Sequence, residues 1–331
     1  MKMPLRHYPQ LMLIARNGNG EASTGHPAWR SLLGQPRIYE WRNDYRPMLK
    51  ANFFKTSVIL LLSVWLTLFV LVPNLLVLTA SFLDRDESGF VKLTLGFGNY
   101  VRLLDPIYLK VFGHSMGLAA ITTLICLGLG YPFAYFLAQF RPGVRLVLLT
   151  LVIVPFWTNS LVRTYAIRGL LAAKGLINNT LIALSLIDEP VRILYTGSAV
   201  LIGMVYVLLP FMILPLYSAI EKLDHTLLEA AADLGAGRWR RFWHVTLPLT
   251  LPGIIAGCLL VFMPALGLFF IADVLGGSRD LLVGNFLKDQ FLDARDWPFG
   301  AAASVVLLGL LCLFLSAYGL SLKRFSHTGQ P

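Results

Sequence analysis

The chain has 331 residues, of which 56% are hydrophobic and only 14% are charged. Soluble globular proteins carry about 25% charged residues, so this composition excludes that class and indicates a polytopic membrane protein. The net charge of +10 fits either nucleic acid or an anionic membrane surface, and the position of the basic residues decides between them.

The N-terminal extension, residues 1–55, holds nine Lys or Arg and three acidic residues. Gly, Asn and Ser are frequent around residues 17–25, so we expect the first part to be disordered. From Trp29 to Lys55 aromatic and basic residues interleave, which predicts a juxtamembrane segment on an anionic lipid surface. Nucleic-acid binding would use similar residues. A basic segment that leads into an apolar helix is more typical of a membrane surface, so no nucleic-acid partner is expected.

Residues 56–323 form the predicted transmembrane domain, and residues 324–331 form a short tail. A helix needs about 20 apolar residues to cross the hydrocarbon core. The apolar runs therefore predict an all-α membrane protein with six transmembrane helices, at Ser57–Phe82, Val111–Phe140, Leu146–Val162, Ile193–Ile220, Thr250–Ala272 and Phe299–Leu322. The polar residues 84–110 and 273–296 are predicted to be loops. The uncharged run inside Tyr165–Arg192 is too short to cross, so one or two interfacial or re-entrant helices are expected there.

The distribution of Lys and Arg predicts the orientation of these helices in the membrane. If both termini are cytoplasmic, the inside segments hold 17 Lys or Arg and the outside segments hold 11. Acidic residues divide the other way, with 7 inside and 11 outside. Cytoplasmic segments of membrane proteins are enriched in Lys and Arg, so we expect a multi-pass protein with both termini in the cytoplasm. Residues 221–248 then form a cytoplasmic loop.

This loop predicts two short helices set at an angle. Its first part, Leu227–Leu234, consists largely of strong helix formers, and Gly235 follows where a left-handed residue would end the helix. Three alanines, residues 230–232, leave a helix surface that another protein can approach closely. Basic and aromatic residues alternate after the glycine, and Pro248 marks the next boundary. A basic aromatic stretch of this kind can also be a simple interfacial anchor.

The loop also resembles the EAA signature of the permeases of bacterial ABC importers, with Val245 where that family usually has isoleucine. The resemblance implies a MetI-like (type I ABC importer) permease fold in the inner membrane, with the loop docked in a cleft of a separate ATPase. The residues that it implies for ATPase coupling are Glu229, Ala230, Ala231, Asp233, Gly235, Leu247 and Pro248. The chain itself has no Gly-x-x-x-x-Gly-Lys-Ser/Thr phosphate loop. We therefore expect no cofactor on this chain, with ATP and Mg bound by the partner ATPase, and no enzymatic activity of its own.

Further blocks between about Leu95 and Leu322 resemble the permeases of the spermidine/putrescine importers, in particular their B-type subunit. These blocks are Phe156–Arg163, Leu209–Pro215, Leu275–Gly277 and Asp296–Gly300. The resemblance implies a heterodimer with a second homologous permease, two copies of an ATPase and a periplasmic polyamine-binding protein. Importers of amino acids or opines share some of these blocks, so that alternative stays open. The first fifty residues depart from the family pattern.

A polyamine is a string of ammonium groups on methylene spacers, so its path should offer carboxylates and aromatic faces. Asp273 directly follows a predicted span, where ionisable groups are often functional. The candidate residues of the substrate path are Asp273, Trp157, Asn159, Tyr165, Tyr206, Phe269 and Phe270. An interfacial role for the acid, and packing or belt roles for the aromatics, are the alternatives. The acids Asp289, Asp293 and Asp296 are predicted to lie in the outer loop, where they could attract cations or simply be solvated.

Two other classes of protein remain open at this point. A membrane-embedded enzyme would need a nucleophile with a base, or a group of metal ligands, but the six histidines form no His-x-x-x-His pair, and no metal site is expected. An ATP-independent carrier or channel would work without nucleotide, and it gives no reason for a cytoplasmic docking helix. Both alternatives predict function of the isolated chain without a partner ATPase.

Overall fold

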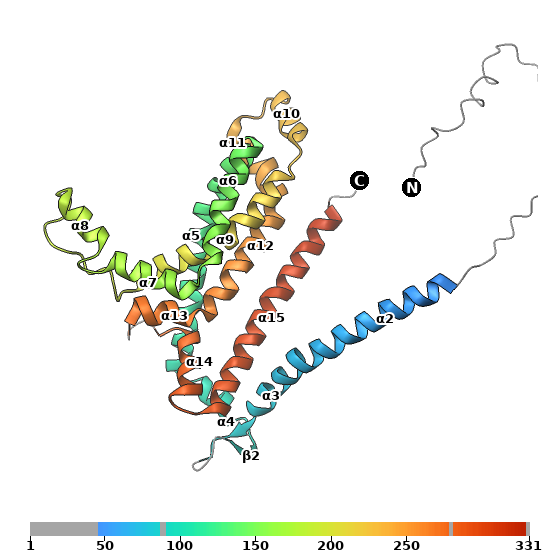
Figure 1. The fold of residues 1–331 in the computed structure, drawn as a ribbon, viewed down its shortest axis with the longest axis vertical. Helices are drawn as coiled ribbons and strands as arrows, with labels where there is room; N and C mark the ends of the chain where they lie inside the picture. The colour runs from blue at the N-terminus through green and yellow to red at the C-terminus, as the bar shows by residue number, and fades with distance from the viewer. Residues whose placement is uncertain (1–45, 87–90, 278–280, 329–331) are drawn as a thin grey trace, which may run out of the picture. The chain divides into compact units, whose positions relative to one another are not determined.

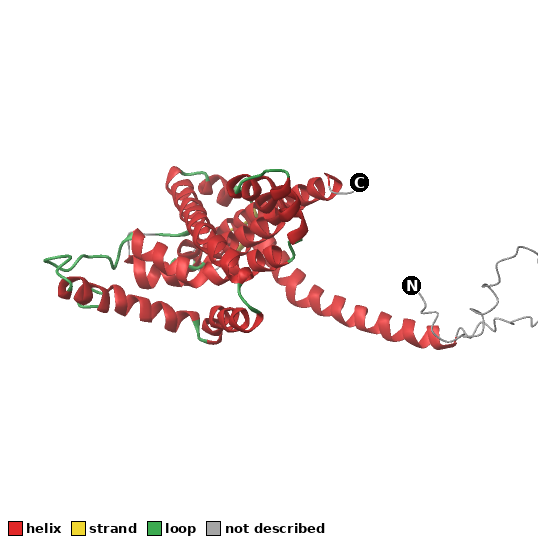
Figure 2. Cartoon of the chain, turned by 90° about the horizontal axis from the view of Figure 1, so that it is seen from above, coloured by secondary structure: helices red, strands yellow, loops and turns green. Residues whose placement is uncertain are grey.

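The computed structural model describes residues 46–86, 91–277 and 281–328. It divides into two compact units, Met1–Val64 and Trp65–Pro331, which are described separately. In the first unit the described residues lie in α2 (Arg46–Leu66), which passes residue 55 without a break. The sequence predictions for residues 1–45 lie outside the described residues. In the second unit nearly all described residues are helical (Figure 2).

Two π-helical turns keep long helices continuous at prolines. The segment η1 (Thr67–Leu71) joins α2 to α3 (Val72–Ala80), and η3 (Phe242–Thr246) precedes α12 (Leu247–Gly267). In each case the residue before a proline donates its N–H five residues back, from Val72 to Thr67 O and from Leu247 to Phe242 O. A proline cannot donate its own helical hydrogen bond, and the wider turn accommodates that loss. Pro248 is therefore not the helix boundary that the sequence predicted.

The predicted loop at residues 84–110 contains regular structure. A short antiparallel pair joins β1 (Leu83–Asp84) to β2 (Lys92–Leu95), and α4 (Gly98–Leu103) follows. The long helix α5 (Pro106–Gln139) begins inside the predicted loop, because the Asp105 carboxylate caps it by accepting from Ile107 N at 2.9 Å. The loop prediction is wrong for most of this segment.

The core of the second unit is formed by α5, α9 (Gly197–Glu221) and α12, which lie side by side (Figure 1). The largest side chains buried between helices include Met204, Leu208, Met212, Leu216 and Val261. Small residues at the crossings let the helices approach. A Cβ added to Gly257 of α12 would lie 2.7 Å from Met212 Sδ of α9, well inside van der Waals contact.

The predicted span Leu146–Val162 is wrong, because the chain bends inside it. The structure has α6 (Pro142–Ile153) and a 3-10 turn, η2 (Val154–Trp157), followed by α7 (Ser160–Leu171) and α8 (Leu176–Ala183). The two parts meet at 98°. Asn159 starts the second part, since its side chain accepts from Leu161 N at 2.8 Å and caps α7. The expectation of short helices in Tyr165–Arg192 is met by α7, which begins earlier, and by α8.

The predicted span Thr250–Ala272 is also interrupted. The helix α12 ends at Gly267, Leu268 is non-helical, and a short turn α13 (Phe269–Ile271) leads into the π-helical η4 (Ala272–Gly276). The segment predicted as a polar loop, residues 273–296, contains η4 and the helix α14 (Val283–Leu292). The last helix, α15 (Trp297–Thr328), runs through the predicted tail boundary.

Five helices in the described residues are long and apolar enough to cross a membrane, and the bent pair α6–α8 would provide a sixth crossing. The prediction of an all-α protein with six transmembrane segments is confirmed in this form.

Candidate functional site

The candidate coupling segment is the part of the chain between α9 and α12. Its first helix, α10 (His225–Asp233), begins at Asp224, whose carboxylate accepts from Thr226 N at 2.9 Å. In Figure 1, α10 and α11 (Arg238–Arg241) lie at one end of the long helices, and α4 lies at the opposite end. The segment is therefore presented at one extremity of the unit.

The helix α10 ends abruptly at Gly235, which has a φ of +79°. The Gly235 N–H bonds to Ala232 O at 2.9 Å, and the Ala236 N–H bonds to Ala231 O at 3.0 Å. This pair of bonds is the Schellman arrangement, in which a glycine in the left-handed conformation closes the last helical turn. The predicted conformation of Gly235 is confirmed.

The second predicted short helix is wrong. After the turn at Gly235, α11, η3 and α12 form one continuous helix, Arg238–Gly267. The basic aromatic stretch is thus the first part of a spanning helix, with Leu247 and Pro248 inside it. The turn at Gly235 thus connects α10 directly to a helix that is part of the core.

The surface of α10 is open in this chain. Leu234 is 89% exposed, and Leu227 is also exposed. The side chains of Glu229, Ala230 and Asp233 are exposed as well, while Ala231 is half-buried. A solvent-exposed leucine beside small alanines and two acids is a surface suited to a partner protein.

Two of the candidate path residues, Trp157 and Asn159, lie at the bend between α6 and α7. Trp157 is the last residue of η2 and is 81% exposed, and Asn159 uses its side chain to cap α7. Tyr165 lies exposed on α7, and Tyr206 lies on an exposed face of α9. An unwound position between two half-helices is the kind of backbone that lines a polar pathway through a membrane protein.

A second group of candidate path residues lies at the break after α12. Phe269 and Phe270 form the start of α13, with ring centroids 6.2 Å apart, and Asp273 is in η4. The Asn285 Nδ2 of α14 donates to Phe269 O at 3.0 Å and also to Asp273 Oδ1. The Phe269 carbonyl also accepts from Ala272 N, so the bond from Asn285 is its second. The break is thus held by a side chain from α14.

Asp273 also forms an ion pair with Lys288 of α14. The Lys288 Nζ lies 2.8 Å from Asp273 Oδ2 and 3.5 Å from Asp289 Oδ1. The hydrogen bond to Asp273 raises the pKa of Lys288, so this ammonium is fully charged at physiological pH. Since α7 packs against α13 and η4, the two breaks belong to one packed region. No contact between Trp157 and Asp273 is seen among the described residues.

Lys288 and Asn285 are candidate site residues that could not be recognised in the sequence. They are three residues apart on α14 and therefore share one helix face. The signal for this helix was present in the sequence Val283–Leu292, where apolar residues recur at helical spacing between polar ones. Among the described residues no group of three or more His, Cys, Asp or Glu side chains could hold a metal ion.

Comparison with known proteins places the chain in a family. Residues 130–325 match the family described as binding-protein-dependent transport system inner membrane component. The chain is 54% identical over 271 residues to the spermidine/putrescine transport system permease protein PotB of Salmonella typhimurium (strain LT2), covering 82% of this chain and 94% of that protein. The chain belongs to this family of transport permeases.

A second relative and a solved structure agree with that assignment. The permease is 56% identical over 254 residues to PotB of Escherichia coli (strain K12), covering 77% of this chain and 92% of that protein. A chain of a bacterial alginate ABC transporter, solved with an alginate pentasaccharide-bound periplasmic protein, superposes with a TM-score of 0.69 at 17% identity, covering 85% of this chain and 97% of that chain. The predicted ABC-importer permease fold and the resemblance to the B-type permeases are confirmed. The permease is a multi-pass inner-membrane protein.

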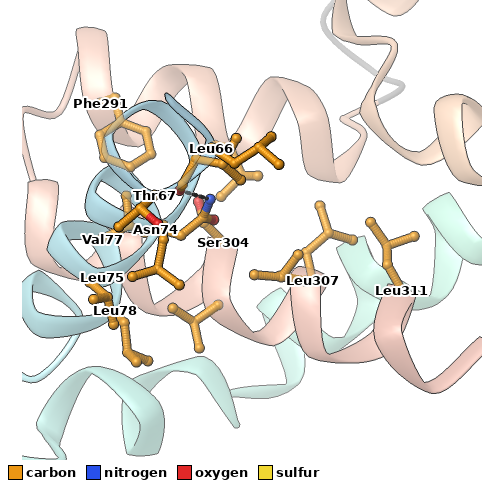
Figure 3. A pocket seen from close by; sticks show the side chains of 15 residues that line it. Leu66, Thr67, Asn74, Leu75, Val77, Leu78, Phe291, Ser304, Leu307 and Leu311 are labelled. Atoms are coloured by element: carbon orange, nitrogen blue, oxygen red, sulfur yellow. Dashed lines mark hydrogen bonds between the residues drawn. The ribbon is translucent and has the colours of Figure 1, made fainter. Parts of the chain in front are cut away.

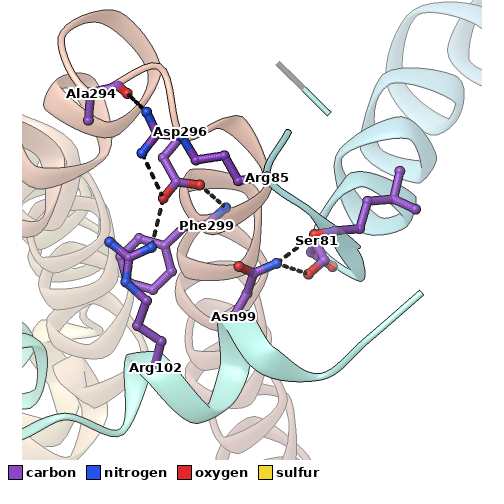
Figure 4. Close-up of polar contacts among 8 residues, drawn as sticks. Ser81, Arg85, Asn99, Arg102, Ala294, Asp296 and Phe299 are labelled. Atoms are coloured by element: carbon purple, nitrogen blue, oxygen red, sulfur yellow. Dashed lines mark hydrogen bonds and ion pairs between the residues drawn. The ribbon is translucent and has the colours of Figure 1, made fainter. Parts of the chain in front are cut away.

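Two further features of the permease lie outside the candidate path. The Asp296 carboxylate, predicted to be in an outer loop, is only 1% exposed and binds Arg102 (Figure 4). Its ion pair joins α4 to the start of α15, which is a structural role. A cavity of about 890 Å³ lies between η1–α3 and α14–α15 (Figure 3). It is lined mostly by Leu and Val, so it offers nothing to a cationic substrate.

Proposed function

We propose that this permease is a transmembrane subunit of an ATP-driven importer for polyamines of the spermidine/putrescine type. The observation that carries the proposal is the identity of more than half of the aligned residues to permeases named for spermidine and putrescine. The candidate path fits this substrate, because it offers the carboxylate of Asp273 and the aromatic side chains of Trp157 and Phe269 to ammonium groups.

The proposed complex contains a second homologous permease, two copies of a cytoplasmic ABC ATPase and a periplasmic polyamine-binding protein. The exposed small-residue surface of α10 supports a docking partner on that side. The alginate transporter was solved in complex with a periplasmic protein, which supports a delivery protein on the opposite side. ATP and Mg would bind the ATPase, and this chain would supply the path and the coupling segment.

The proposed orientation has both termini and α10 in the cytoplasm, where ATP is available. The excess of Lys and Arg in the predicted inside segments supports it, with 17 against 11 outside. Closure of the ATPase subunits would displace α10, and the turn at Gly235 would pass that displacement to α12. Because α12 packs against α5 and α9, the core helices would move together and open the path alternately to each side.

The test is to reconstitute the permease with the subunits of its importer and to measure which compounds stimulate ATP hydrolysis and uptake. We expect spermidine or putrescine, delivered by the binding protein, to stimulate both. Stimulation by an amino acid or an opine instead would keep the importer class and reject the polyamine substrate. Uptake by this chain alone without nucleotide would reject the importer class.

The substitution Asp233→Cys provides the matching test of orientation. A membrane-impermeant thiol reagent should label this cysteine only after the inner face of the membrane is exposed. Labelling from the periplasm would place α10 on the wrong side for an ATPase.

A further inference from the structure

The carboxylate of Asp273 already holds an alkylammonium group, which belongs to Lys288. The Lys288 Nζ lies 2.8 Å from Asp273 Oδ2 and 6.0 Å from the centroid of the Phe269 ring. A carboxylate and an aromatic face are the two groups that recognise a primary ammonium ion. The end of a lysine side chain, an ammonium on a methylene chain, has the chemistry of the end of a polyamine.

Asn285 fixes the position of the Asp273 carboxylate beside the helix break. Asn285 is only 5% exposed, and its Nδ2 donates both to Asp273 Oδ1 and to Phe269 O. The other oxygen of the carboxylate, Oδ2, is the one that faces Lys288. The Asn285 Oδ1 is a buried acceptor without a hydrogen-bond donor among the described residues.

We propose that Lys288 is a tethered competitor that occupies the ammonium subsite of the substrate path and sets its selectivity. This inference rests on the proposed polyamine function. When a substrate arrives, one of its ammonium groups replaces the Lys288 ammonium on Asp273 Oδ2, beside the Phe269 ring.

The displaced lysine has a second carboxylate within reach. Asp289 Oδ1 lies 3.5 Å from Lys288 Nζ, on the next residue of α14. Lys288 can therefore exchange Asp273 for Asp289 with a small rearrangement of its side chain, and its charge stays compensated. Without Asp289, the exchange would leave the lysine unpaired and would be less favourable.

The exchange discriminates between monoamines and polyamines. A monoamine replaces one ammonium group by another, so it gains little from the exchange. A polyamine also places its remaining ammonium groups on other parts of the path, and these contacts provide the net free energy of binding. Lys288 thus weakens the binding of cations with a single charge, because they make no further contacts that compensate for displacing it.

The experiment measures equilibrium binding of spermidine and of butylamine, a monoamine probe, to the purified importer complex in lipid nanodiscs without the binding protein. The substitution Lys288→Met removes the competing ammonium group and keeps a side chain of similar length. We expect spermidine to bind about three- to tenfold more tightly than in the wild type, and butylamine binding to increase at least as much. In Lys288→Arg the competitor pairs more strongly with the carboxylate, and spermidine should bind more weakly.

Three controls separate the possible outcomes. Lys92→Met removes an exposed lysine of β2 and should bind spermidine as the wild type does. In Asp273→Asn, adding Lys288→Met should no longer increase affinity, because the subsite is lost. If the Lys288→Met complex fails to assemble, spermidine binding to the Lys288→Arg complex alone tests the inference.

Two results would reject different statements. If the wild-type complex takes up spermidine but Lys288→Met binds it no more tightly, Lys288 is not a competitor and the inference fails. If the wild-type complex neither binds nor takes up spermidine, the proposed function fails with it.

Discussion

Arg102 and Asp296, which are 194 residues apart in the sequence, join the beginning and the end of the second unit by a hydrogen bond of 2.7 Å. Arg102 also stacks its guanidinium over the Phe299 ring, 4.0 Å from the centroid. Burial is the largest single effect and disfavours the charged form of Arg102, but the interactions with Asp296 and Tyr108 together outweigh it and raise the pKa of Arg102. Arg102 is therefore charged at physiological pH, and its contact with Asp296 fixes α4 against the first turn of α15.

Asp296→Asn should destabilise the permease. The substitution leaves Arg102 without its buried anion and weakens the cap in which Phe299 N donates to Asp296 Oδ1 at 3.3 Å. Breaking a buried ion pair costs several kcal/mol, and half-exposure of Arg102 reduces this to about 2 kcal/mol. We expect the midpoint of thermal denaturation to fall by roughly 5 °C. The exposed carboxylate variant Asp293→Asn should leave it unchanged, and equal midpoints for both variants would contradict a structural role for the pair.

Gly203→Ala should disturb the helix break that carries Asp273. A Cβ at Gly203 of α9 would overlap the Leu275 side chain and lie 3.1 Å from Ile271 Cγ2, and both of these side chains are fully buried. Overpacking of this kind costs about 1–3 kcal/mol. We expect a lower thermal midpoint and reduced uptake.

The control for this prediction is Gly117→Ala on α5, where an added Cβ would meet nothing within 4 Å. There alanine should be neutral or slightly stabilising, because it has the higher helix propensity. If Gly203→Ala were as stable as Gly117→Ala, the close packing of α9 against η4 would be refuted.

The end of α10 could be predicted because its cause is local. A run of helix formers followed by Gly235 needs no distant contact to stop, and the structure has the left-handed glycine there. The two helix breaks could not be predicted from hydropathy. Leu268 and Asn159 lie in apolar runs. The mean hydropathy of such a run stays high even when one of its residues is non-helical, so it does not reveal the break.

The ion pair of Asp273 could not be predicted from the sequence for a different reason. Residues 273–296 are polar, and a polar stretch between apolar runs was interpreted as a loop, so the positions of their side chains were undefined. In the structure α14 folds back onto the break, which brings Asn285 and Lys288 to Asp273. Such contacts depend on tertiary packing, and the spacing of apolar residues along the sequence does not reveal them.

Gly235→Ala should weaken coupling between ATP hydrolysis and transport. At a φ of +79° an alanine costs about 1 kcal/mol or more, so the Schellman turn shifts or opens and α10 loses its fixed position relative to α12. We expect normal insertion and several-fold lower uptake per ATP hydrolysed in the reconstituted complex. Gly237→Ala is the matched control, because Gly237 has a φ of −63° and open space around its Cβ position.

Gly235→Asp and Glu229→Lys should have larger effects than Gly235→Ala. The aspartate adds a charge to the strained turn, and the lysine reverses a charge on the exposed surface of α10. Both variants should insert and assemble in the membrane without supporting transport. Wild-type rates of ATP-driven uptake in either variant would argue strongly against α10 as the coupling helix.

Asp273→Asn should reduce polyamine uptake without preventing assembly. The Asp273 carboxylate is exposed, so its loss should affect stability little, whereas an amide cannot bind an ammonium group by charge. Loss of one charge-assisted contact predicts a decrease of about tenfold in the apparent affinity for spermidine. Initial rates of labelled spermidine uptake over a range of concentrations, with Asp293→Asn as the control, provide the measurement. Lys288 keeps its contact with Asp289 in this variant, so its charge stays compensated. Unchanged uptake kinetics in Asp273→Asn would remove Asp273 from the path.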